Sequence, residues 1–97
     1  MLRHVVLFTW SDTADGARRA AAESALRRLE HEVGGMSSLL VASDAGLVEG
    51  NADTVLIADF PDAAACARYA ADPVHQAVLD EYVRPWLAGR AAVQVTA

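Results

Sequence analysis

The hydrophobic pattern of the chain predicts four β-strands. Short segments rich in Val, Leu, Ile and aromatic residues are typical of strands, and the chain contains several of them. The expected strands are residues 2–10, 39–48, 54–60 and 91–96. A glycine-containing connection, GLVEGNAD, leads from the second strand to the third.

A long amphipathic helix is expected between the first two strands. Apolar side chains recur there at helical spacing, opposite Arg and Glu side chains, up to about Val33. Asp12 or Thr13 can cap the start of this helix. Gly34 and Gly35 end it, because glycine tolerates the left-handed conformation that follows many helices.

Two further helices are expected between the third and fourth strands. The first is alanine-rich and occupies residues 62–71, with Asp62 at its start. The second begins at Asp72 and Pro73, an N-cap residue followed by proline at the first helical position, and Gly89 ends it.

The order of these elements predicts a ferredoxin-like α+β fold. Strand, helix, strand, strand, helices, strand is the split βαβ pattern, with one four-stranded antiparallel sheet in the order 4-1-3-2. The whole chain, residues 1–97, then forms a single domain. A constant register between the first and third strands opposes Arg3 to Asp59, Val5 to Ile57 and Leu7 to Val55 on one face, and His4 to Ala58, Val6 to Leu56 and Phe8 to Thr54 on the other.

Both faces of the predicted sheet are apolar, but the helices can cover only one of them. A soluble monomer does not tolerate an uncovered apolar face of this size. The hydrophobic fraction of 54% is also high for so small a chain. We therefore expect a homodimer in which a twin sheet buries the second face, giving a dimeric α+β barrel.

Composition excludes several classes of protein. The net charge is −5 and no basic run occurs, which disfavours nucleic acid and membrane surfaces as partners. All eight basic residues are arginine, so Schiff-base and pyridoxal-phosphate chemistry, which need a lysine amine, are excluded. Three histidines show no metal-ligand spacing, and we expect neither a metal nor another cofactor.

The cysteine count and the start of the chain indicate a cytoplasmic protein. Cys66 is the one cysteine, so no internal disulfide can form, which fits a reducing compartment. The first apolar segment is too short to span a bilayer, and no small-residue cleavage site follows it. We therefore interpret that segment as a strand and not as a signal peptide.

His75 is the leading candidate for chemistry. It lies in the first turn of the last helix, on an apolar stripe with Val78, Leu79, Tyr82 and Trp86. Burial and the positive end of the helix dipole both disfavour the charged imidazolium. A neutral imidazole is what a general base requires. Tyr69 could then donate its phenol proton to a developing enolate oxygen or orient the ring.

A structural interpretation of these residues stays open. A histidine near a helix start is often a packed residue whose ring bonds to a backbone group or, in this chain, to Asp72. Tyr69 can equally be a buried tyrosine with a satisfied hydroxyl. The strand pattern turns His4 toward the helices, where it lines a pocket or pairs with a polar neighbour. Cys66 could face the same pocket, although no adjacent cation activates it.

Three stretches carry a family resemblance that covers essentially the whole chain. HVVLFTW at the start, GLVEGNADTVLIADF in the middle, and DPVHQAV followed by RAAV resemble the stress-responsive A/B barrel (Dabb) family. The resemblance implies a dimeric α+β barrel of small subunits. One branch of the family, represented by the plant olivetolic acid cyclase, is similar in fold and motif. That enzyme closes a linear polyketide thioester by an intramolecular aldol condensation without a cofactor.

The resemblance implies roles for several residues. It places the catalytic histidine at His75 and the catalytic tyrosine at Tyr69. His4 and Trp86 also match residues of that enzyme. Together with Val6, Phe8, Leu26 and Leu56, which the strand and helix patterns turn toward the same space, they complete the expected pocket. The chain departs from the cyclase in its long helix, where Ala22 and Leu26 replace bulky aromatic residues, and at Asp72, where the cyclase has histidine.

Three functional hypotheses follow. The first is a cofactor-free lyase or polyketide-cyclase-type enzyme whose pocket between sheet and helices holds a small hydrophobic or aromatic molecule. The second is a stress-responsive or ligand-binding dimer without turnover, and the third is a structural dimer with a filled core. Cofactor-independent oxygenation, known in other dimeric α+β barrels, is a further alternative.

Overall fold

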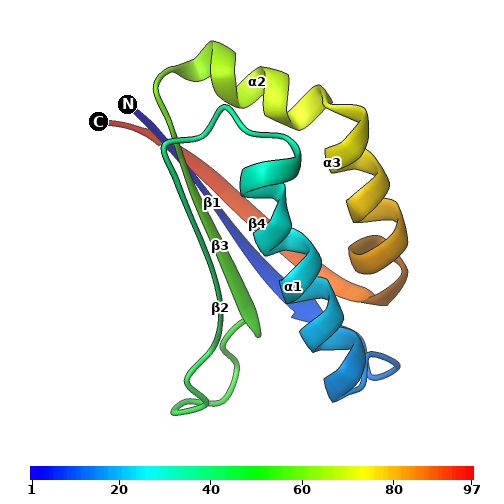
Figure 1. Cartoon of the computed structure of the whole chain (residues 1–97). Helices are drawn as coiled ribbons and strands as arrows, with labels where there is room; N and C mark the ends of the chain where they lie inside the picture. Colours follow the sequence, from blue (N-terminus) through cyan, green and yellow to red (C-terminus); the bar gives the residue numbers. More distant parts are fainter.

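The computed structural model describes all 97 residues, and its helices lie on one face of a four-stranded antiparallel sheet (Figure 1). The strands are β1 (Leu2–Trp10), β2 (Ser38–Ser43), β3 (Thr54–Phe60) and β4 (Leu87–Thr96). The helices are α1 (Gly16–Glu32), α2 (Ala63–Ala71) and α3 (Pro73–Val78), and α3 continues into a π-helical turn (Leu79–Val83) and a 3₁₀ turn (Arg84–Trp86). None of the helices combines the length and the apolar character needed to cross a bilayer.

The predicted topology is confirmed. The strand order is β2-β3-β1-β4, the ferredoxin-like arrangement expected from the order of elements. All six predicted pairs between β1 and β3 are present in the predicted register. Arg3 and Asp59 also form a bidentate ion pair, with N–O distances of 2.8 and 3.0 Å. This pairing lowers the pKa of the Asp59 carboxyl, chiefly through the hydrogen bond from Arg3.

The predicted cap of α1 is wrong by two or three residues. Asp15 is the N-cap, and its carboxylate accepts a hydrogen bond of 2.8 Å from the backbone N–H of Arg18. Asp12 and Thr13 lie in the turn that precedes the helix, where the Ser11 and Thr13 hydroxyls are 2.8 Å apart. The side chain that reaches the third helical N–H decides the start of the helix.

β2 ends at Ser43, five residues earlier than predicted. Asp44 then closes a local turn, since its carboxylate accepts a hydrogen bond of 2.9 Å from the Gly46 N–H. Gly46 has a φ of 76°, a conformation that a strand cannot contain. The apolar Leu47 and Val48 therefore lie in the connection to β3, where both are exposed.

The last helix is shorter than predicted, and the last strand is longer. Pro85 has no backbone N–H to continue a helix, and the chain becomes extended at Leu87, directly after the 3₁₀ turn. β4 begins at Leu87, which pairs with Trp10, and a bulge at Ala88 of β4 separates this pair from the next, Thr9 with Gly89. Gly89, predicted to end the helix, lies inside β4.

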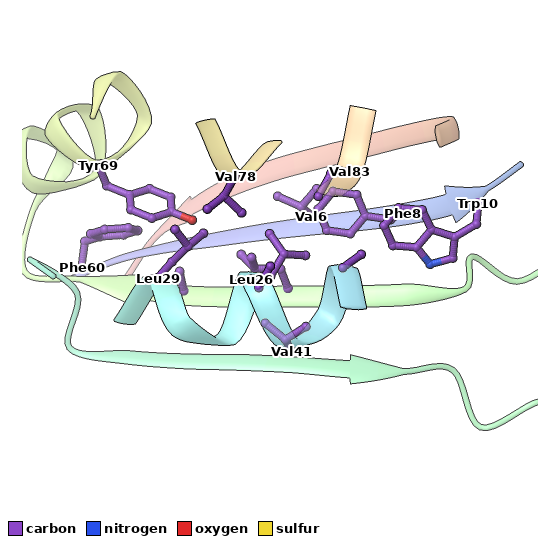
Figure 2. Close-up of a cluster of buried hydrophobic side chains, with 14 of the residues drawn as sticks. Val6, Phe8, Trp10, Leu26, Leu29, Val41, Phe60, Tyr69, Val78 and Val83 are labelled. Atoms are coloured by element: carbon purple, nitrogen blue, oxygen red, sulfur yellow. The ribbon is translucent and has the colours of Figure 1, made fainter. Parts of the chain in front are cut away.

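The core lies between the sheet and the helices. Alternate residues of β1 and β3 point into it and meet Leu26 and Leu29 of α1, both fully buried (Figure 2). Glu23 of α1 is also buried, and the hydroxyls of Ser43 and Thr54 each donate to it at 2.7 Å. Thr54 in turn accepts a hydrogen bond of 3.0 Å from the indole N–H of Trp10.

The second face of the sheet has no cover from the chain itself. No helix lies on this side of the sheet (Figure 1). Leu7, Leu40, Val93 and Val95 on this face keep between 41% and 55% of their surface exposed. The predicted contrast between a covered and an uncovered apolar face is therefore present.

Candidate functional site

A cavity of about 420 Å³ lies between the sheet and the helical segment that runs from α2 to the 3₁₀ turn. This volume is in the range of small-molecule binding sites. Most of the lining is apolar, and its polar side chains come from β1, α3, the 3₁₀ turn and β4. Seven of the eight predicted pocket residues line it: His4, Val6, Phe8, Leu26, Leu56, Tyr69 and His75.

Trp86 is the predicted pocket residue that does not line the cavity. It lies beside the long helix instead, with the guanidinium carbon of Arg18 4.3 Å from the ring centroid. The π-helical turn explains the difference. A π turn holds more residues per turn than an α-helix, so it rotates the following side chains away from the predicted stripe. Leu79 of the predicted stripe lines the cavity, and Val83, which lies outside that stripe, lines it where Tyr82 and Trp86 were expected.

His75 is held by a backbone group rather than by a carboxylate. Asp72 caps α3, accepting a hydrogen bond of 2.8 Å from the Val74 N–H, and His75 follows as the third helical residue. Its Nδ1 lies 3.3 Å from the carbonyl oxygen of Ala70. Because a carbonyl can only accept, Nδ1 carries the proton and Nε2 keeps a free lone pair.

The surroundings of His75 keep the imidazole neutral. Burial is the largest effect and lowers its pKa below the ordinary histidine value. The hydrogen bond to Ala70 and the charge of Asp72 act in the opposite direction, whereas the charges of Arg84 and Arg90 lower the pKa further. The net result is a neutral half-buried ring with one unprotonated nitrogen.

Tyr69 packs directly against this ring. The two ring centroids are 4.2 Å apart and the planes are inclined by 34°. Tyr69 is 3% exposed and also contacts Phe60, and its hydroxyl points toward the middle of the helix–sheet interface (Figure 2). Burial raises the pKa of the phenol, so it stays protonated. Its hydroxyl makes no hydrogen bond within the chain, which leaves the proton available to a molecule in the cavity.

His4 supplies a second imidazole from β1. The Nε2 of Gln94 lies 2.9 Å from His4 Nδ1, and because an amide nitrogen only donates, Nδ1 is the acceptor. The remaining ring nitrogen, Nε2, therefore carries the proton and is a donor. Burial lowers the pKa of His4, and the charges of Arg90 and His75 lower it further. His4 and His75 are thus both neutral, with opposite tautomers.

Besides His4 and His75, the polar part of the lining comes from α3, the 3₁₀ turn and β4. Arg84 donates to the Gln76 side chain at 3.0 Å, and Gln76 donates to the carbonyl of Ala70 at 2.7 Å. Arg90 and Gln94 line the cavity from β4. No group of three His, Cys, Asp or Glu side chains is arranged to hold a metal ion.

The family model of the stress responsive A/B barrel domain, Dabb, matches residues 2–97. The chain belongs to the Dabb family. This match confirms the family that the sequence motifs indicated. No curated protein matches the chain at a significant level.

Solved structures show the same fold over nearly the whole Dabb chain. A dimeric ferredoxin-like protein of unknown function from Thermobifida fusca is 31% identical, with a TM-score of 0.89 over 99% of this chain and 90% of that one. A Dabb protein from Mesorhizobium loti is 16% identical, with a TM-score of 0.82 over 99% and 95%. A hydroxynitrile lyase from Passiflora edulis is 12% identical, with a TM-score of 0.84 over 97% and 90%.

Sequence reasoning predicted His4 and His75 but missed the other four polar residues that line this Dabb cavity, which are Gln76, Arg84, Arg90 and Gln94. Arg90 and Gln94 alternate on β4, so the register between β1 and β4, in which Gln94 lies opposite His4, would have placed them. Arg84 follows the π-helical turn, whose position the sequence does not indicate, and no sequence pattern placed Gln76 or Arg84 in the cavity. Cys66, suspected of facing the pocket, does line it, and burial raises the pKa of its thiol.

Proposed function

We propose that this Dabb chain is a homodimeric, cofactor-free enzyme of the lyase or cyclase type that abstracts a proton next to a carbonyl group. The free Nε2 of His75, beside Tyr69 in a cavity of ligand size, is the observation that carries this proposal. The hydroxynitrile lyase with the same fold supports it, since the fold accommodates lyase chemistry in that protein.

In the proposed reaction His75 acts as the general base. Nε2 takes a proton from the carbon next to the carbonyl, and the electron pair of that C–H bond moves onto the carbonyl oxygen. Tyr69 and the Nε2–H of His4 donate hydrogen bonds to the resulting enolate oxygen. The enolate carbon then attacks a second carbonyl of the same molecule, and His75 returns its proton to the new alkoxide. This is the aldol step of a polyketide cyclase, and the reverse sequence is a lyase reaction.

The uncovered sheet face supports the homodimer. Its exposed apolar side chains would be buried by the same face of a second copy. The Thermobifida fusca relative, at 31% identity, is described as dimeric. Two copies would then form a barrel with a cavity on the outer side of each sheet, under each set of helices.

The base step can be tested without knowing the natural substrate. Exchange of α-protons for deuterium in a panel of β-keto acids and β-keto thioesters, followed by NMR, measures proton abstraction directly. We expect His75→Gln to lower the exchange rate by about 100-fold or more and Tyr69→Phe to lower it less. His31→Gln, a change at an exposed histidine on α1, is the matched control and should leave the rate unchanged.

The outcome also decides between enzyme and binding protein. Exchange that is as fast in His75→Gln as in the unchanged protein would contradict the proposal, provided that the variant keeps its melting temperature. No exchange with any probe, together with binding that persists in His75→Gln, would favour the ligand-binding dimer.

A further inference from the structure

The charge lining the cavity is opposite in sign to that of the whole chain. The chain carries a net charge of −5. The cavity lining nevertheless contains two arginines and two histidines and no aspartate or glutamate. A cavity lined by cations in an otherwise acidic protein has a positive electrostatic potential, which favours an anionic ligand.

The two arginines differ in what they already contact. Arg84 forms an ion pair with Asp80 and donates to Gln76, so its charge is balanced within the helical segment. Arg90 forms no ion pair, and its guanidinium makes no hydrogen bond with any group of the chain. The cavity therefore has one guanidinium without a protein partner.

The strand register places Arg90 on the catalytic side of the sheet. Arg90 lies opposite Phe8, and Gln94, four residues further along β4, lies opposite His4. Alternation puts both on the face that carries Val6 and Phe8. Arg90, His4 and His75 line the same cavity, and the charge of Arg90 lowers the pKa of both imidazoles.

We propose that the cavity binds an organic carboxylate with an aryl or acyl body, whose carboxylate group is held by the guanidinium of Arg90. This inference rests on the proposed function, because it assigns the substrate class to the same cavity. A planar guanidinium matches a carboxylate with two parallel hydrogen bonds. One unpaired guanidinium balances the single negative charge of a carboxylate but only half of the charge of a phosphate dianion. Leu79 and Leu87, which line the cavity and are only partly buried, supply apolar surface for the body of the ligand.

Binding of the carboxylate has a consequence for the base. A carboxylate on Arg90 neutralises the charge that disfavours the protonated form of His75. The basicity of His75 therefore rises when the substrate is present, and the ring is a better proton acceptor in the complex than in the free protein.

The test compares an acid with its uncharged amide. Titrations of the intact protein with 3-phenylpropanoate and with 3-phenylpropanamide, followed by protein NMR, measure both affinities. We expect the acid to bind at least about tenfold more tightly, and Arg90→Gln to remove this preference while leaving amide binding unchanged. Arg68→Gln, a change at an exposed arginine of α2 that lines no part of the cavity, should retain the preference.

Several outcomes would overturn the inference and leave the proposed function standing. Equal binding of acid and amide, or a preference that survives Arg90→Gln, would show that Arg90 does not recognise a carboxylate. Tighter binding of phenyl phosphate than of 3-phenylpropanoate would show that the site prefers a phosphate to a carboxylate. Failure of both probes to bind would also overturn it, while the α-proton exchange assay still tests His75 independently. Arg90→Lys keeps the positive charge but loses the two parallel N–H donors of the guanidinium, so its affinity for the acid should lie between those of the unchanged protein and Arg90→Gln.

Discussion

Replacing Leu40 by glutamate should convert the proposed dimer into a monomer. Leu40 lies in β2 on the uncovered face and is 52% exposed in the single chain. Full burial of a leucine contributes about 1.5–3 kcal/mol, so the exposed half has ~1 kcal/mol left to contribute in each protomer. A twofold dimer contains the residue twice, and Leu40→Ala should therefore weaken dimerisation by ~2 kcal/mol, or roughly 30-fold in Kd.

Leu40→Glu adds a larger penalty than Leu40→Ala. Two unpaired carboxylates would enter the interface, and the desolvation cost is several kcal/mol for each ion. Sedimentation velocity at micromolar concentration should therefore show a monomer for Leu40→Glu and a dimer for the unchanged chain. Val74→Glu is the matched control, since Val74 is 42% exposed but lies on α3 in the helical layer. A monomeric unchanged chain, or a dimer that tolerates Leu40→Glu, would refute the barrel.

Three further predictions concern stability. The free energy of unfolding should fall from about pH 7 to about pH 5. The pKa values of His4 and His75 lie below the ordinary ~6.5 in the folded chain, so the unfolded chain takes up more protons in that range. Urea denaturation at both pH values measures this loss of stability, and His75→Gln should make the loss smaller. Leu29→Ala should cost about 2–5 kcal/mol by urea denaturation, and Leu26→Ala should in addition enlarge the cavity and improve the binding of bulkier probes. Thr54→Val should lower the stability measured by thermal denaturation by about 1–3 kcal/mol, because the buried indole N–H of Trp10 and the buried carboxylate of Glu23 each lose a hydrogen-bond partner. A loss smaller than the experimental error would show that these hydrogen bonds do not stabilise the fold.

The sheet was predictable because side-chain alternation ties register to burial. A slip of one residue between β1 and β3 would have moved His4, Val6 and Phe8 to the uncovered face. It would also have separated Arg3 from Asp59, whose ion pair fits one register only. The family motifs and the cap at Asp72 then placed His75 in the first turn of α3, and Tyr69 beside it.

The errors arose where the backbone departs from regular periods. A stripe counted at 3.6 residues per turn cannot anticipate a π-helical turn, so Trp86 was assigned to the pocket and Val83 was overlooked. Leu47 and Val48 look like a strand by composition, but the Asp44 turn removes them from β2. The volume of the cavity also cannot be predicted from the sequence, because small side chains such as Ala70 either leave space or let the backbone move closer.

The way in which His75 is held limits the chemistry that it can perform. A carboxylate partner would raise the basicity of the ring, whereas the carbonyl of Ala70 fixes the tautomer without adding a charge. Burial lowers the pKa of His75 by more than the hydrogen bond to Ala70 raises it, so the free protein offers a weak base. A weak base removes only an already acidic proton at a useful rate, such as one between two carbonyl groups. The proposed mechanism therefore predicts a β-keto substrate rather than a simple ketone. Exchange should be faster at the carbon between two carbonyls than at one beside a single ketone, by more than their rates in buffer differ.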